Sequence, residues 1–274
     1  MAITARYEPL TLRRDAVTES VTQTIQGFLD GLGVAAPFTI APFGRELVLS
    51  DWLDQIIQVY DPDNDVAVAT INTRPLTTGT PPAPLGVPLN AIEYRTIANE
   101  RTIVAAHFVS AGTTSRLVRY SGPGFTTIQV LGSYPNRRFT GMASRGSRYW
   151  VADAVGGSIF EFDDNGIGTE VATRLVNPRG LDAWNGHLLV IEGAPAARLT
   201  AVRLADGRKT VMDTLPQLQP ANQAVASSLV PDVTVDEDTQ DVYFSAPGHV
   251  STGHSDNRTL RRISAREIER LLRE

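Results

Sequence analysis

The chain of 274 residues contains no cysteine, which excludes thiol nucleophiles, thiolate metal sites and disulfides together. It has a single lysine, Lys209, among 25 basic residues. Lys209 adjoins the turn-forming pair Asp206–Gly207, where an amine is not desolvated enough to form an imine. Histidine is also scarce, so any acid–base mechanism must draw on few candidates: His107, His187, His249 and His254.

The sequence also lacks the patterns of a membrane or nucleic-acid-binding protein. No apolar run approaches the roughly 18 residues of a membrane span, and no charged-then-apolar signal begins the chain. We therefore expect a soluble protein, either cytoplasmic or secreted with its signal removed. The net charge of −5 gives no basic face for nucleic acid, so the expected partner is a small organic molecule, with neither nucleic acid nor membrane.

One stretch sets the pattern for the chain, RYWVADAVGGSIFEFDDNG from Arg148. It predicts a β-hairpin, because an apolar strand ends on Asp153, small residues form a turn, and an alternating strand runs to Phe162. The same frame returns through most of the sequence. Periods of about 40 to 55 residues with four short strands each predict a repeat architecture.

Five repeats can be read between Gly33 and Ile263, and two stretches without periodicity, 73–88 and 214–230, are predicted to be long loops. Two further strands are predicted within 3–28. After the last repeat, Ser264 as N-cap, Glu267 three residues later and apolar Ile268, Leu271 and Leu272 predict a short amphipathic helix.

Three segments carry a family resemblance: PRGLDAWNGHLLVIEG from Pro178, PDVTVDEDTQDVYFSA from Pro231 and RYWVADAVGGSIFEF from Arg148. They resemble the NHL-type and gluconolactonase-like (senescence-marker, strictosidine-synthase-like) proteins. The resemblance implies an all-β fold, a single β-propeller domain of four-stranded blades over residues 1–274. Residues 1–33 would close the ring, 34–263 would form the five recognisable blades and 264–274 the helix. Six blades are usual in that family, and a five-bladed ring is the alternative.

In a propeller the innermost strands begin on the face where the turn after each second strand also opens. That face is called the rim below, and both long loops also rise on it. At innermost strand starts we place Phe38, Asn90, Thr140, Arg179 and Asp232. Second-strand ends contribute Asp51, His107, Asp153 and Glu192, and the loop 247–257 adds His249 and His254. A pocket at this rim is the expected ligand site.

The family resemblance also implies a divalent cation bound by Glu, Asn, Asn and Asp at the strand starts. Here Asn90 and Asp232 match, but Phe38 stands where the Glu is expected, and Thr140 and Arg179 occupy the remaining starts. A hard cation requires several oxygen ligands and avoids a guanidinium. We expect no cofactor and an Arg179–Asp232 ion pair; a divalent cation near Asn90 and Asp232 is the less favoured alternative.

Structural roles compete with functional ones for these residues. Asp51, Asp153 and Glu192 recur in the repeats and are expected to cap turns through backbone N–H groups. His107 replaces the acidic residue of its repeat, which leaves function and chance equally open. Phe38 and Trp52 can either line the cavity or pack between blades.

The predicted function is small-molecule binding at the rim, with acid–base chemistry that uses no metal as the enzymatic form. That chemistry would be hydrolysis of a lactone-like substrate, or a cyclase or lyase step. The candidate catalytic residues are Asp232, His249, His254 and His107, and the candidate substrate-binding residues are Asn90, Arg179, Thr140, Phe38 and Trp52. The alternative is a non-catalytic NHL-type propeller that binds a ligand or a protein partner.

Overall fold

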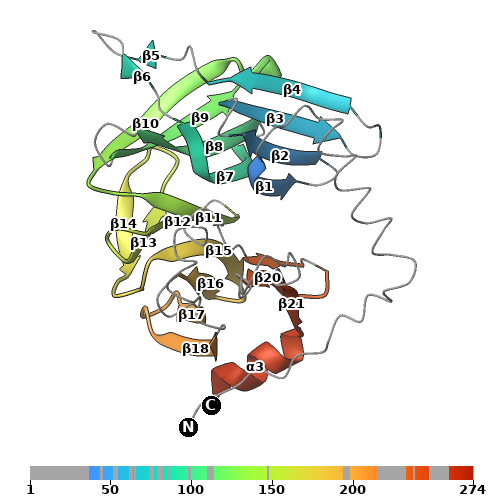
Figure 1. Cartoon of the computed structure of the whole chain (residues 1–274), viewed down its shortest axis with the longest axis vertical. Helices are drawn as coiled ribbons and strands as arrows, with labels where there is room; N and C mark the ends of the chain where they lie inside the picture. The colour runs from blue at the N-terminus through green and yellow to red at the C-terminus, as the bar shows by residue number, and fades with distance from the viewer. Residues whose placement is uncertain are drawn as a thin grey trace, which may run out of the picture. The chain divides into compact units, whose positions relative to one another are not determined.

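The computed structural model describes residues 37–43, 46–51, 55–61, 64, 66–73, 77–78, 83–84, 87–97, 100–109, 114–146, 148–193, 198–214, 233–236, 238–246 and 259–273. They are mostly antiparallel β-strands, with one α-helix near the C-terminus (Figure 1). The chain divides into two compact units. Described residues up to Phe139 belong to the first unit, and those from Thr140 onward belong to the second.

The first unit contains two four-stranded sheets and a two-stranded ribbon. One sheet is formed by β1 (Pro37–Phe43), β2 (Glu46–Asp51), β3 (Ile56–Asp61) and β4 (Val66–Asn72). The other is formed by β7 (Val87–Ile97), β8 (Glu100–Val109), β9 (Thr114–Ser121) and β10 (Thr127–Pro135), with a 3-10 turn η1 (Pro123–Phe125) before β10. The ribbon pairs β5 (Thr77–Thr78) with β6 (Ala83–Pro84).

The second unit contains three sheets and the helix. The first sheet is β11 (Phe139–Arg145), β12 (Arg148–Asp153), β13 (Ser158–Phe162) and β14 (Gly168–Ala172). The second is β15 (Pro178–Trp184), β16 (His187–Glu192), β17 (Arg198–Arg203) and β18 (Lys209–Thr214). The third is β19 (Val233–Val235), β20 (Val242–Ala246) and β21 (Thr259–Ile263), followed by α3 (Ala265–Arg273).

Strand order follows sequence order in every one of these sheets, which is the meander of a propeller blade. The hairpin predicted from Arg148 is confirmed, since Tyr149 pairs with Phe162 and Asp153 with Ser158. The loop predicted over 73–88 is corrected in part: it contains the β5–β6 ribbon, and β7 already begins at Val87. The pair Thr77–Thr78 favours a strand, but the prolines around it leave no alternation of apolar and polar residues in the sequence.

Some predictions lie outside the described residues, namely the N-terminal strands within 3–28 and, except for Thr214 at the end of β18, the loop 214–230. The fifth sheet has three strands within the described part of the chain. The number of blades and the single-domain organisation therefore stay predictions.

Strand β16 is buried on both of its faces. Leu188 and Val190 belong to a core cluster with Trp150 and Ala152 of β12. Alternate residues Leu189 and Ile191 belong to another cluster, with Val233, Phe244 and the helix residues Ile268 and Leu271. Because strand side chains alternate between faces, a strand that is apolar at successive positions fits between two neighbouring sheets.

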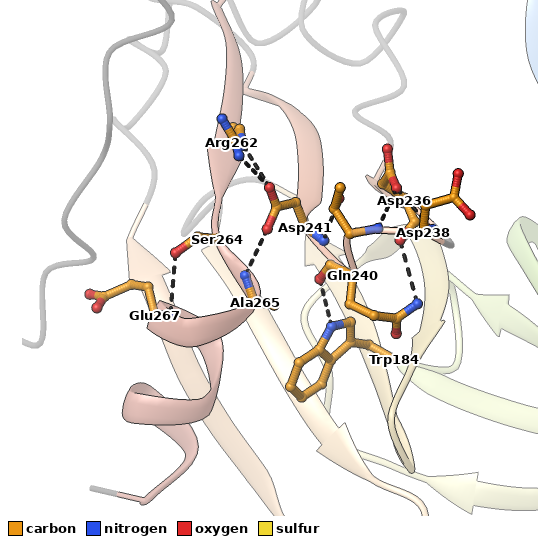
Figure 2. A network of polar contacts seen from close by, with 10 residues as sticks. Trp184, Asp236, Asp238, Gln240, Asp241, Arg262, Ser264, Ala265 and Glu267 are labelled. Carbon is orange, nitrogen blue, oxygen red and sulfur yellow. Dashed lines mark hydrogen bonds and ion pairs between the residues drawn. The ribbon is translucent and has the colours of Figure 1, made fainter.

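The capped C-terminal helix predicted from the sequence is confirmed, and it packs against the last sheet (Figure 2). Ser264 Oγ accepts a hydrogen bond from the Glu267 backbone N–H at 3.3 Å. Asp241 fixes the helix start to the sheet, because its Oδ1 accepts from Ala265 N at 2.9 Å while its Oδ2 accepts from Arg262 Nε at 2.8 Å. Ile268 and Leu271 are buried against the sheet, so α3 closes the core of this blade.

Candidate functional site

The innermost strands are irregular at their starts, where the sequence places the candidate ligand-binding residues. The first strands of neighbouring sheets lie beside each other, β1 next to β7 and β15 next to β19. In three of these strands the first or second residue is a proline that pairs with the predicted second-strand residue: Pro37 with Asp51, Pro88 with His107, Pro178 with Glu192. The predicted equivalence of Asp51, His107 and Glu192 is therefore confirmed.

A register shift follows each of those prolines. The shift leaves Phe38 as the extra residue in β1, Leu89–Asn90 in β7, and Arg179–Gly180 opposite Ile191 in β15. Bulges re-aim side chains at strand ends and are common beside functional sites. Three of the predicted rim residues, Phe38, Asn90 and Arg179, thus occupy bulges.

In the second unit, the connection 173–177 between β14 and β15 is bonded to two turns. Leu175 N donates to Gly157 O at 2.9 Å in the turn after β12. Gly193 N, in the turn after β16, donates to Val176 O at 3.1 Å and to Asn177 O at 3.0 Å. The predicted meeting of innermost strand starts with second-strand turns on one face is confirmed here.

Glu192 is a buried rim residue that is fully inaccessible to solvent. Its Oε1 accepts from Arg198 Nε at 2.6 Å and from Thr200 Oγ1 at 2.6 Å. Its Oε2 accepts from Arg198 Nη2 at 3.0 Å and from Val176 N at 2.5 Å. Burial acts to raise the pKa of Glu192, but these hydrogen bonds outweigh burial and lower it, so the carboxylate is ionised.

The structural role predicted for the recurring acids is confirmed for Asp153 and refined for Glu192. Asp153 Oδ1 accepts from Val155 N at 3.1 Å and so caps its own turn. Glu192 instead bonds Val176, in the connection that leads into β15. Glu192 therefore holds the start of an innermost strand as well as its own hairpin.

Thr140 and Arg179 are the two predicted substrate-binding residues that the structure brings together. Thr140, in β11, donates through Oγ1 to Pro178 O at 2.6 Å, directly before Arg179. A Cβ at Gly141 would lie 2.0 Å from Arg179 O, so the two innermost strands touch backbone to backbone. Arg179 itself is 8% exposed. A guanidinium is therefore enclosed at a strand start whose backbone is held from both sides.

His107, in the first unit, is enclosed more completely than a rim residue open to ligand. It is fully inaccessible, and its Nε2 lies 2.7 Å from Tyr120 Oη. Burial raises the pKa of Tyr120, so this hydroxyl stays protonated and can donate to the imidazole. The pair spans one buried face of β8 and β9.

The other predicted site residues are described only in part or not at all. Phe38 lies in β1 and Asn90 in β7, without a described side chain. Four of the predicted residues lie outside the described part of the chain: Trp52, Asp232, His249 and His254. The predicted Arg179–Asp232 ion pair is therefore not described either. Their roles stay predictions.

The residues present at β11 and β15 do not fit a divalent cation. Thr140 donates to Pro178 O, directly before Arg179, and the guanidinium at this strand start would repel a cation. Within the part of the chain that the structure describes, no three His, Asp or Glu side chains gather as a metal site would require.

Sequence reasoning missed three polar residues at this rim, Arg198, Thr200 and Asn177. Glu192 and Arg198 face each other across the β16–β17 hairpin, and Asn177 adopts a positive φ of 47°. Pairing the acid with the arginine six residues later would have found the ion pair, because opposite charges at directly paired positions stabilise a hairpin.

Comparison with known proteins gives the fold and no family. No family model matches the chain, and no curated protein matches it. No described helix is long and apolar enough to cross a membrane.

Solved structures do match, at low sequence identity. A gluconolactonase from Xanthomonas campestris has 13% identity and a TM-score of 0.58, over 83% of this chain and 72% of that one. The PQQ-bound aldose sugar dehydrogenase from Streptomyces coelicolor has 14% identity and a TM-score of 0.56, over 82% of this chain and 80% of that one. A chain of the nidogen/laminin complex has 12% identity and a TM-score of 0.54, over 73% of this chain and 70% of that one. Together with the four-stranded meanders, these matches show that the chain has the β-propeller fold.

Proposed function

We propose that this β-propeller binds a small organic molecule at the rim where its innermost strands begin. The observation that carries the proposal is the enclosed guanidinium of Arg179, 8% exposed, in the bulge at the start of β15. Its backbone is held by Thr140 on one side and, through Val176, by Glu192 on the other. A cation held at a strand start is suited to an oxygen-rich ligand.

The reaction we propose is hydrolysis of a lactone-like ester, which the similarity to a gluconolactonase supports. Water adds to the lactone carbonyl, the ring C–O bond breaks, and a hydroxy acid forms. Arg179 would stabilise the negative charge that develops on the carbonyl oxygen. From the sequence, Asp232 with His249 or His254 would take the proton from water; His107 is less suited because it is fully enclosed. A cyclase or lyase step would use the same groups.

The test is a pH-stat assay of a panel of aldonolactones, with Arg179→Met and a matched control, Arg203→Met. Arg203 pairs with His187 at the opposite end of β16 and β17 and carries an exposed ion pair with Asp206. We expect Arg179→Met to lower kcat/KM by about 100-fold, the typical loss when one oxyanion-stabilising group is removed. The control should keep wild-type activity, and turnover should survive chelator.

Either of two results would contradict this function: equal activity of the two variants, or activity restored only by a divalent ion. The similarity to a chain of the nidogen/laminin complex favours the second candidate, a propeller that binds a protein. Absence of turnover and of ligand-induced stabilisation across the whole panel would favour that candidate.

A further inference from the structure

Arg198 is presented at the rim as a fixed guanidinium. Two of its five N–H donors bind the buried Glu192 carboxylate side-on, through Nε and Nη2. The Arg198 side chain is 30% exposed, and within the described residues its Nη1 makes no hydrogen bond. A guanidinium held by a carboxylate on one edge offers its other edge to a second oxyanion at low entropic cost.

Asn177 supplies a second donor in the same neighbourhood, because Val176, the residue before it, binds the same Glu192 Oε2 as Arg198 does. Its backbone is in the left-handed region, with φ of 47°, and its O accepts from Gly193 N. The amide Nδ2 lies where a side chain of residue 193 would be, 2.7 Å from a Cβ built there. Within the described residues this Nδ2 makes no hydrogen bond. Glycine at 193 thus leaves room for an amide donor directly after Glu192.

The sequence between Gly193 and Arg198 offers these donors no side-chain acceptor. It reads Ala194–Pro195–Ala196–Ala197, without a polar side chain. Half-buried donors are normally paired, so two donors near one carboxylate that lack an acceptor among the described residues favour an external one.

The charges around the connection 173–177 also favour an anion. Exposed Arg174 lies in this connection, and Lys209 Nζ donates to Thr173 O at 2.8 Å and Arg174 O at 3.2 Å. The nearby carboxylates already have donors: Glu192 binds Arg198, Asp153 accepts from Val155 N, and Glu170 Oε2 accepts from Ser158 Oγ at 2.8 Å.

We propose that Asn177, Gly193 and Arg198 form an oxyanion subsite that binds a carboxylate or phosphate group of a small ligand. Arg198 Nη1 and Asn177 Nδ2 are its donors, Glu192 positions Arg198, and Gly193 provides the space. The subsite goes beyond the proposed lactone chemistry and does not depend on it, because binding of an oxyanion requires no turnover.

The test is a titration of ¹⁵N-labelled full-length protein with inorganic phosphate and, separately, with acetate, at constant ionic strength. Saturable shifts are expected at the amides of Val176, Asn177 and Gly193 and at Arg198 Nε with at least one of the two anions. Binding by phosphate alone would identify a phosphate-bearing ligand. Binding by acetate as well would identify a carboxylate.

Two variants with matched controls decide the assignment. Asn177→Gly removes the amide and keeps a residue that tolerates positive φ, and Asn185→Gly makes the same change at φ of 39° at the far end of the blade. Arg198→Lys keeps a positive charge next to Glu192 but loses the planar set of guanidinium N–H donors. Arg203→Lys is its control on the same strand. We expect each subsite variant to weaken anion binding at least tenfold and each control to change it less than twofold. The proposal is wrong if neither anion gives saturable shifts, or if either subsite variant binds as tightly as its control.

Discussion

Replacing Glu192 with alanine is expected to lower the free energy of unfolding by about 3–5 kcal/mol, the usual loss when one partner of a buried ion pair is removed. The substitution leaves Arg198, Thr200 Oγ1 and Val176 N without their common acceptor. Urea unfolding followed by circular dichroism measures the loss. Asp206→Ala is the control, because it breaks the exposed ion pair with Arg203 of β17 and should cost far less. Similar losses in the two variants would contradict the role of Glu192.

The same carboxylate predicts the acid sensitivity of the fold. The pKa of Glu192 is lowered in the folded state. The ionised carboxylate therefore contributes fully to the free energy of unfolding above the ordinary pKa of 4.5, and this contribution is lost as the pH falls through the lower pKa of the folded state. The unfolding free energy of the wild type should therefore decrease below about pH 4.5. In Glu192→Gln the decrease should be smaller, since no proton is taken up at this position. Parallel pH profiles would refute this assignment.

Gly141→Ala is expected to lower the free energy of unfolding by about 3 kcal/mol, at the upper end of the usual range for an overpacked core. The new Cβ would lie 2.0 Å from Arg179 O and 3.1 Å from Leu181 N, both backbone atoms of the neighbouring innermost strand. Neither can rotate away, so β11 and β15 must separate. Because Thr140 and Arg179 adjoin the clash, we expect the affinity for a ligand at the rim to decrease together with the stability.

The control for this variant is Gly132→Ala. Its Cβ would meet the Tyr134 side chain, with Oη at 2.3 Å, and a tyrosine ring can turn aside. Thermal unfolding of the two variants makes the comparison. An equal or larger loss for Gly132→Ala would show that the backbone contact of β11 with β15 does not restrict the fold.

The strands and the blade frame could be predicted from the sequence because each repeat carries its own local pattern. Pro178 to Glu192 turns at Asn185–Gly186 and continues as a short apolar run, and each of these signals acts within a few residues. The same local logic placed Thr140 and Arg179 at strand starts and Ser264 at the helix N-cap, where the structure has them.

The contacts that build the rim could not be predicted in this way. The bond from Glu192 to Val176 joins residues 16 apart through a connection whose path depends on two neighbouring blades. Asn177 reaches its position only because φ is positive there and because Gly193, in the turn after β16, has no side chain. Such pairings follow from how sheets pack, which a periodic pattern does not encode.

The central claim is that the ligand binds where the innermost strands begin, next to Arg179. A crystal structure of the protein soaked with an aldonate, the product of lactone hydrolysis, tests this claim most directly. We predict density for the ligand within hydrogen-bond distance of the Arg179 guanidinium. Density only at the opposite end of the blade, beside the Asn185–Gly186 turn, would contradict the claim.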